Sequence, residues 1–236
     1  MHHVLVDQWS QGASPLHARD PRAKVMVLLI FLVALATTAP DAAVTLTIDA
    51  ALLVAGILIA GLPPGGLLLR AMAILPFSLT FGLISWLAGD RLRAIGLAEK
   101  SYLSTAAVLL LVGTTPLPRL LSGLESMGCP RLLVLLAQFL YRYLFVISEQ
   151  AQHLRLAAAC REGRARKNRR SKFRAAAGAL AVLFARSYYR AEGIHQAMLA
   201  RAFAGRFATL NPLRFRATDG LFTAALAVLL ILARLP

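Results

Sequence analysis

The sequence contains five apolar runs whose lengths approach the thickness of a membrane. The runs cover residues 25–39, 42–62, 67–89, about 101–114 and 221–235. A bilayer core of roughly 30 Å is crossed by about 20 helical residues, and a helix satisfies its own backbone groups there. With 58% hydrophobic residues and a mean hydropathy of +0.65, the chain is too apolar for an ordinary soluble domain. The pattern predicts an all-α integral membrane protein with about five transmembrane helices.

Proline and charged residues refine the ends of these runs. The first run is short for a span, so its helix is expected to begin near Arg22, with Arg22 and Lys24 reaching the membrane interface. Pro76 lies inside the third run and predicts a kink. The polar stretch 90–100 is expected to precede the fourth span. No cleavable signal peptide is expected, because no basic segment is followed directly by an apolar core and a cleavage site.

Positive charge is concentrated between the fourth and last apolar runs. Residues 117–217 hold 18 of the 26 Lys and Arg residues but only four of the 11 Asp and Glu residues. Because Lys and Arg resist translocation, this block is expected on the cytoplasmic side, with a cytoplasmic N-terminus and an external C-terminus. We therefore divide the chain into a membrane domain of about four spans (1–116), a cytoplasmic domain of long amphipathic helices (117–216) and a C-terminal transmembrane helix (217–236).

Three helical pieces are predicted in the basic block from the spacing of its apolar residues. They cover 117–127, 131 to about 162, and about 175–204. On the third piece, three arginines and one alanine lie within an arc of about 60°, at 100° per residue. Such a basic stripe is suited to bind an acidic surface. The stripe consists of Arg186, Arg190, Ala197 and Arg201. The run GRARKNRRSKFR (163–174) has seven basic residues, and we interpret it as a solvated turn beside anionic lipid headgroups.

Five further segments stand out by their composition and their order along the chain. They are SPLHARDPRAK before the first run, TTPLPRLLSGLESMGCPRLL after the fourth, YRYLFVISEQ, CREG and FARSYYRAEGIHQAMLARAF. In sequence and order they resemble the transmembrane T component of energy-coupling factor (ECF) transporters, over nearly the whole chain. The resemblance implies a non-catalytic permease subunit in a bacterial or archaeal plasma membrane. In such a subunit, residues 117–216 form a cytoplasmic coupling domain.

The resemblance also implies two arginine sites for partner ATPases. Family members carry two Ala-Arg-Xaa motifs, one near the end of each long coupling helix, whose arginine enters a groove of an ATPase subunit. The docking candidates are Ala200, Arg201, Ala202, Cys160, Arg161 and Glu162, with Arg164, Arg186 and Arg190 in support. The first motif, at 160–162, departs from the pattern, because Cys replaces Ala and an acid follows the Arg. Arginine suits such a groove because its guanidinium bonds carboxylates bidentately. The alternative is that these arginines contact lipid phosphate.

Within the family, the segments SPLH…DPR.K and TTP.P..L..L...G.P look most like the cobalt branch, called CbiQ. The resemblance implies cobalt uptake with two ABC ATPase subunits, which use ATP and Mg, and a membrane substrate-binding S component that captures the metal. The chain itself is expected to contact the lipid bilayer and to bind no cofactor. A nickel or vitamin T component, or more remotely a basic membrane scaffold protein, stays an alternative.

Other classes of function lack their motifs in this sequence. The G-x-x-x-x-G-K-[ST], H-E-x-x-H and G-x-S-x-G patterns are missing, so neither ATP hydrolysis nor another hydrolase activity is predicted. Nucleic acid is not an expected partner, because the basic run contains one aromatic residue, Phe173, for base stacking. No metal site is expected, because the five histidines lie on the predicted cytoplasmic side, with His153 and His195 on helix surfaces.

Asp49 and the two cysteines carry separate expectations. Asp49 is the one acid within the second run, and it is either a helix-packing polar residue or a buried partner for Arg70. Cys129 and Cys160 are too few for a disulfide framework or a four-ligand metal cluster. Both are expected to be small buried residues.

Overall fold

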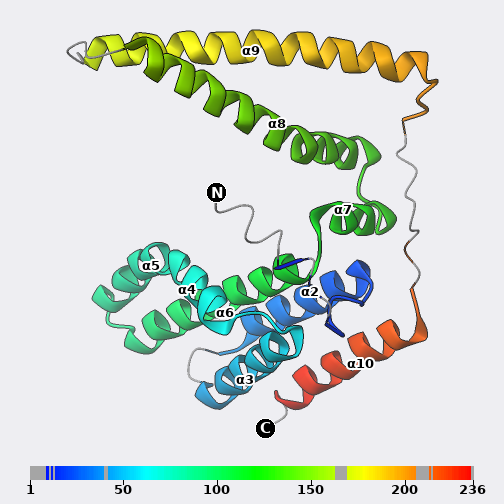
Figure 1. Cartoon of the computed structure of the whole chain (residues 1–236). Helices are drawn as coiled ribbons and strands as arrows, with labels where there is room; N and C mark the ends of the chain where they lie inside the picture. Colours follow the sequence, from blue (N-terminus) through cyan, green and yellow to red (C-terminus); the bar gives the residue numbers. More distant parts are fainter. Residues whose placement is uncertain are drawn as a thin grey trace. The chain divides into compact units, whose positions relative to one another are not determined.

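Helices form all the regular secondary structure in the part of the chain that is described. The computed structural model describes residues 9–10, 12, 14–39, 42–162, 169–205, 213 and 215–234. The helices are α2 (Pro21–Thr37), α3 (Ala43–Ala60), α4 (Pro64–Ala71), the 3₁₀ turn η1 (Met72–Ile74), α5 (Leu75–Leu87), α6 (Arg91–Thr114), α7 (Leu117–Ser126), α8 (Arg131–Glu162), α9 (Arg169–Ala200) and α10 (Ala217–Leu232) (Figure 1). The predicted all-α class is confirmed.

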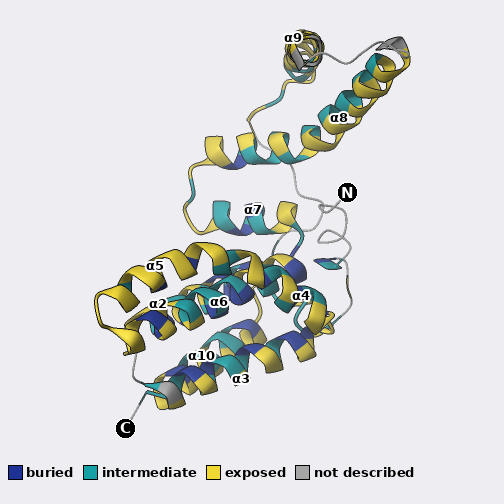
Figure 2. Cartoon of the chain, turned by 90° about the vertical axis from the view of Figure 1, so that its left-hand side faces the viewer, coloured by how far each residue is buried: buried dark blue, intermediate teal, exposed yellow. Residues whose placement is uncertain are grey.

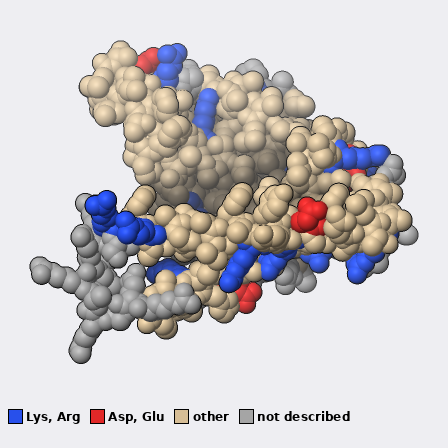
Figure 3. Space-filling model, turned by 90° about the horizontal axis from the view of Figure 1, so that it is seen from above, with Lys and Arg blue, Asp and Glu red and all other residues tan. Residues whose placement is uncertain are grey.

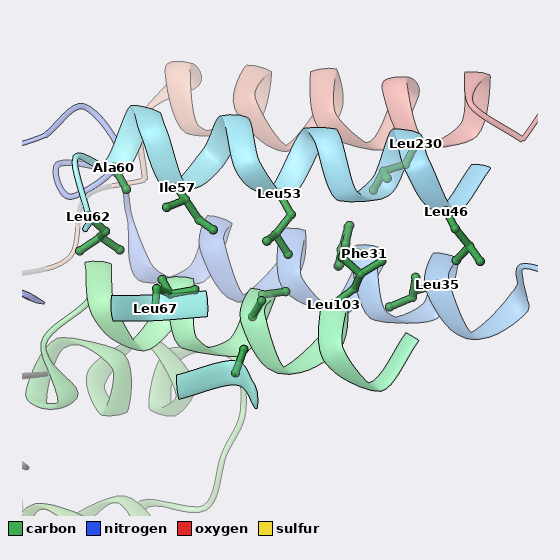
Figure 4. Close-up of a cluster of buried hydrophobic side chains, with 13 residues drawn as sticks. Phe31, Leu35, Leu46, Leu53, Ile57, Ala60, Leu62, Leu67, Leu103 and Leu230 are labelled. Carbon is green, nitrogen blue, oxygen red and sulfur yellow. The ribbon is translucent and has the colours of Figure 1, made fainter. Parts of the chain in front are cut away.

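The chain divides into two units. The first comprises Met1–Gly128 and Pro212–Pro236, and the second comprises Cys129–Asn211 with α8 and α9. In the first unit, apolar side chains from α2, α3, α4, α6 and α10 form one core (Figure 4). On α3 they recur at helical spacing, as at Leu53 and Ile57. Because lipid is as apolar as leucine, such residues stabilise a membrane bundle mainly by close packing.

Large apolar side chains also cover much of the outside of the first unit. Val44, Phe77 and Leu87 are 74%, 65% and 79% exposed, and Figure 2 shows exposed positions along the outer faces of these helices. A soluble monomer rarely exposes so much contiguous apolar surface. Among the described residues, Pro64–Leu87, Arg91–Thr114 and Arg131–Cys160 are long and apolar enough to cross a membrane, and Val44–Ala60 and Ala217–Leu232 are shorter apolar helices. The chain is an all-α membrane protein.

One of the three long apolar stretches lies in α8, within the domain predicted to be cytoplasmic. A helix of its length and composition fits either a membrane span or a position along the apolar boundary of the bilayer. The cytoplasmic placement of α8 therefore stays a prediction.

Two local features lie where the sequence predicts them. α2 begins at Pro21, where the Asp20 carboxylate caps the helix by accepting from the Arg22 N–H at 2.9 Å. The third run is interrupted just before Pro76, where α4 gives way to the 3₁₀ turn η1 and α5 then begins. Proline lacks an N–H and its ring clashes with the carbonyl four residues earlier, at Met72, which is the first residue of η1.

The bounds of three helices differ from the prediction, and each of the three begins in a charged stretch. α6 begins at Arg91 rather than near Ser101, and α10 covers Ala217–Leu232 rather than 221–235. α9 begins at Arg169, inside the basic run predicted to be a turn, and ends at Ala200; residues 163–168 of that run lie outside the described residues. The prediction placed helix bounds next to charged residues. Arg and Lys are nevertheless good helix formers in water or at an interface.

α7 packs with the first unit, close to the start of α2. A Cβ added at Gly123 would lie 3.2 Å from the Cβ of Pro21 and 3.8 Å from the backbone nitrogen of Arg22. The missing side chain at 123 therefore permits the close approach of the two helices. The sequence-based division assigns α7 to the cytoplasmic domain at 117–216, whereas the contacts group it with the helices of the first unit.

The expectation that both cysteines are buried is wrong. Cys160, in the last turn of α8, is exposed, and Cys129 is only partly buried. Cys160 lies on a helix whose surface is mostly exposed within its own unit (Figure 2). The small size and low polarity of cysteine predict burial only where a packed core is available.

Candidate functional site

The second of the two motifs, Ala200-Arg201-Ala202, forms the C-terminal cap of α9. Ala202 has a φ of +52°, in the left-handed region. Its N–H donates to the Leu199 carbonyl at 3.0 Å, and the Phe203 N–H donates to the Met198 carbonyl at 3.0 Å. These two bonds form a Schellman cap, which satisfies carbonyls that the last turn would leave unpaired. The residue after Arg201 is therefore restricted to a conformation that disfavours large and β-branched side chains.

Arg201 is held at this cap with its side chain exposed. Its N–H donates to the Met198 carbonyl at 3.1 Å, which fixes its backbone. The guanidinium carries five N–H donors in a planar fork. Its position at the negative end of the helix dipole is favourable for a cation. Arg201 is thus presented on a rigid element and is free to bond a carboxylate of another protein.

The first motif lies at the end of α8. Cys160, Arg161 and Glu162 are the last three residues of that helix. Cys160 is exposed, while the side chains of Arg161 and Glu162, and the whole of Arg164, lie outside the described residues. The structure therefore places the backbone of this motif at a helix end, as it does for the second motif.

The two motifs lie at opposite ends of α9. Figure 1 shows α8 ending near the start of α9, so the first motif adjoins one end of α9 and Arg201 stands at the other. α9 has 32 residues, which corresponds to about 48 Å at 1.5 Å per residue. Two arginines this far apart suit two separate partner sites better than a single groove.

The basic stripe predicted on α9 is divided between two environments. Arg186 is exposed, whereas Arg190 is partly buried. The Gln150 side-chain amide is oriented so that its oxygen faces Arg190. That oxygen accepts hydrogen bonds from both Nη atoms of Arg190 and lies 3.3 Å from Nη1. Arg190 therefore connects α9 to α8, and Arg186 remains available on the outer face. Seen from above, Lys and Arg side chains are more widespread than Asp and Glu side chains (Figure 3).

A buried lysine joins two of the segments on which the family resemblance rests, so the expectation that Lys24 reaches the membrane interface is wrong. Lys24, only 6% exposed, donates from Nζ to the Thr114 carbonyl at 2.9 Å and to Thr115 Oγ1 at 3.0 Å. Lys24 ends the segment SPLHARDPRAK, and the two threonines begin TTPLPR. A buried ammonium is stable only where acceptors surround it, and a helix C-terminus supplies them. The junction connects the start of α2 to the end of α6.

A second polar contact ties the same N-terminal segment to α10. Arg19 Nη1 lies 3.5 Å from Asp219 Oδ1. The other oxygen of Asp219 accepts from the Arg216 N–H at 3.1 Å and so caps α10. Asp219 is 4% exposed, so both of its oxygens are engaged inside the protein. The segment 14–24 therefore contacts both the end of α6 and the start of α10.

Asp49 is a buried ion-pair residue, but its partner is not the one suggested by the sequence. Asp49 is fully buried, and its Oδ2 lies 3.1 Å from Nη2 of Arg234. Arg234 also donates to Thr38 Oγ1 at 3.2 Å. The pairing with Arg70 is wrong, because the Arg70 guanidinium instead lies over the ring of Trp9, 4.3 Å from its centroid. The observed pair joins α3 to the end of the last helix.

Among the described residues, no three His, Cys, Asp or Glu side chains are grouped closely enough to hold a metal ion. His153 and His195 are exposed on α8 and α9, as predicted for helix-surface positions. The His17 ring nitrogens lie 2.6 Å from Ser14 Oγ and 2.9 Å from the Trp9 carbonyl oxygen. A neutral imidazole with its proton on Nε2 satisfies both contacts, since it donates to the carbonyl and accepts from the hydroxyl.

Comparison with known proteins identifies related sequences. The sequence model of the family described as "CbiQ: Cobalt transport protein" matches residues 12–210. The cobalt transport protein CbiQ of Rhodobacter capsulatus is 31% identical over 153 residues, which cover 60% of this chain and 62% of that protein. An uncharacterized protein of Methanocaldococcus jannaschii is 27% identical over 106 residues, covering 45% of this chain and 39% of that protein. The chain thus aligns with less than two thirds of the length of either relative.

Proposed function

Because the family match extends over residues 12–210, the chain belongs to the CbiQ family of cobalt transport proteins, and we propose that it is the transmembrane coupling (T) subunit of an ECF-type ABC importer. The observation that carries this proposal is the position of Arg201, exposed at the capped end of the 32-residue helix α9. An exposed arginine at a helix end supports docking of the second motif on another protein.

In the proposed complex, Arg201 and Arg161 each enter a groove of one ABC ATPase subunit. The length of α9, about 48 Å, supports two separate ATPases rather than one. Those subunits bind ATP and Mg, while this chain supplies the helix ends that carry Arg161 and Arg201, together with the first unit, which lies in the membrane. The left-handed cap at Ala202 keeps the residue after Arg201 small, which permits close approach of a partner surface.

Movement of the ATPases is proposed to be transmitted to the first unit through residues 128–130. The boundary between the two units falls after Gly128, whose φ of +104° is accessible mainly to glycine. Pro130 follows immediately and precedes α8. A short segment between two packed units is a suitable pivot where it contains a glycine, because glycine can change φ and ψ at little cost.

Cobalt ion is the proposed substrate, supplied by a membrane S component that captures the metal. The support is the family description and the name of the R. capsulatus relative. The proposed location is the plasma membrane, with several spans and a cytoplasmic N-terminus. Metal uptake assays with cobalt and nickel as competing ions distinguish the two metals, and vitamin uptake by the same complex would replace the cobalt assignment.

Co-purification of the ATPase subunits tests the docking role of Arg201. Charge reversal in Arg201→Glu should weaken attachment by about 2–5 kcal/mol, or roughly 30-fold or more in Kd, because it places like charges together in a groove. The matched control is Arg174→Glu, which changes the same charge at an exposed position of the same helix. Normal recovery of ATPases with Arg201→Glu, or equal loss with both variants, would remove the specific role of Arg201.

The first motif is tested in the same assay. Arg161→Glu alone should reduce recovery less than Arg201→Glu, because Arg164 lies close in sequence and can partly replace it. The double variant Arg161→Glu, Arg164→Glu should lose the second ATPase. Full recovery of two ATPases with the double variant would show that this helix end does not dock.

A further inference from the structure

The first unit contains a cavity among α2, α3, α6 and α10. Its volume is about 250 Å³. Leucine, isoleucine, valine, alanine, glycine and phenylalanine form nearly all of its wall, and the polar residues that line it are Lys24 and Thr114. The Lys24 ammonium and the Thr114 hydroxyl already have hydrogen-bond partners in the protein. A cavity with such a wall offers water too few partners to hold it.

The cavity opens at the outer face of α3. Two of its lining residues, Ala55 and Ile59, are exposed, and they lie one helical turn apart. α3 is an apolar helix of a membrane protein, so its outer face is surrounded by hydrocarbon. An apolar cavity that is open to hydrocarbon is filled from the bilayer.

Charge at one end of the cavity favours an anionic headgroup. Lys24 marks the end formed by the start of α2 and the end of α6, and Arg119 is exposed in the first turn of α7, which follows α6. Two carboxylates lie at the same end, and each faces an arginine. Asp219 Oδ1 lies 3.5 Å from Arg19 Nη1, and Asp20 Oδ1 lies 4.0 Å from Arg22 Nε. These two pairs leave the charges of Lys24 and Arg119 as the positive balance.

We propose that this cavity binds one acyl chain of an anionic phospholipid, with the phosphate at the basic end near Lys24 and Arg119. The occupant would fill the space that α2, α3, α6 and α10 enclose. Its acyl chain enters past Ala55 and Ile59. The site is independent of the ATPase-docking motifs, so the proposal does not rest on the transport function.

The test uses phosphatidylglycerol that carries a photoactivatable diazirine in one acyl chain, with the full chain in phosphatidylcholine nanodiscs. Cross-linked peptides from α2, α3 and α6 are quantified by mass spectrometry. Ala55→Phe should block the opening and lower labelling of the cavity wall at least about fivefold. Ala51→Phe is the matched control, since Ala51 is exposed one turn earlier on α3 and does not line the cavity. Labelling of the cavity wall in this variant should equal that in the unaltered chain.

Undiminished labelling in Ala55→Phe overturns the proposal. Ile59→Trp narrows the same opening from the next turn and serves if Ala55→Phe does not fold, as judged by gel filtration. Unlabelled phosphatidylglycerol in excess should compete with the probe more strongly than unlabelled phosphatidylcholine. Equal competition by the two lipids would overturn the assignment of an anionic headgroup.

Discussion

Replacing Ala202 by glycine is expected to stabilise the C-terminal end of α9. Ala202 has a φ of +52°, a left-handed conformation that costs an L-residue roughly 1–2 kcal/mol and glycine almost nothing. The greater freedom of glycine in the unfolded chain offsets part of this gain. The net effect should be about 0.5–1 kcal/mol, or roughly two- to fivefold in the equilibrium for opening the cap. Ala202→Val should have the opposite effect, because a β-branched side chain is least tolerated there.

Hydrogen exchange measures this directly at the cap. The amides of Arg201, Ala202 and Phe203 donate to carbonyls of the last helical turn, so a peptide covering residues 198–205 reports cap opening. Ala197→Gly is the control with the opposite sign, because glycine at this exposed position inside α9 should cost about 1 kcal/mol. If Ala202→Gly lowers protection as Ala197→Gly does, the left-handed cap and the reason for a small residue after Arg201 are both refuted.

Three other predictions concern the stability of the first unit and the orientation of the chain in the membrane. Lys24→Met should lower stability by about 1–3 kcal/mol, because it leaves the Thr115 hydroxyl and a buried carbonyl without their donor; an unchanged thermal midpoint in detergent would contradict this. Asp49→Leu should destabilise by about 3–5 kcal/mol by leaving the Arg234 charge unpaired. Adding Arg234→Leu should recover much of the loss, and equal midpoints for the single and double variants would argue against the pair. In a chain without its native cysteines, Ala197→Cys should react with an impermeant thiol reagent only after cells are permeabilised, and reaction in intact cells would reverse the topology.

The helices of the membrane unit could be predicted from the sequence because two simple signals locate them. Length and hydropathy give the apolar runs, and Pro76 accounts for the 3₁₀ turn just before it. The starts of α6 and α9 were missed because both begin in charged segments, at Arg91 and Arg169. A charge limits how far a helix enters the hydrocarbon, but it does not end the helix itself.

The polar contacts of the first unit could not be predicted, because each joins residues distant in sequence. Asp49 pairs with Arg234. The sequence suggested Arg70, which is nearer along the chain, because it does not show that Arg234, just after α10, lies beside Asp49. Lys24 meets Thr115 through the packing of α2 on α6, and the sequence showed only a lysine at the edge of a span. The motif at 200–202 was found from the family pattern, but its left-handed cap follows from backbone geometry alone.

The most direct test of the coupling role is ATP-driven cobalt uptake in proteoliposomes. The S component and both ATPase subunits are reconstituted with this chain, without it, or with its Arg201→Glu variant, and radioactive Co²⁺ inside the vesicles is counted after ATP is supplied to the ATPase side. The proposed function predicts uptake with the unaltered chain, background uptake without it, and strongly reduced uptake with Arg201→Glu. Equal ATP-driven uptake with and without the chain would contradict its assignment as the coupling subunit.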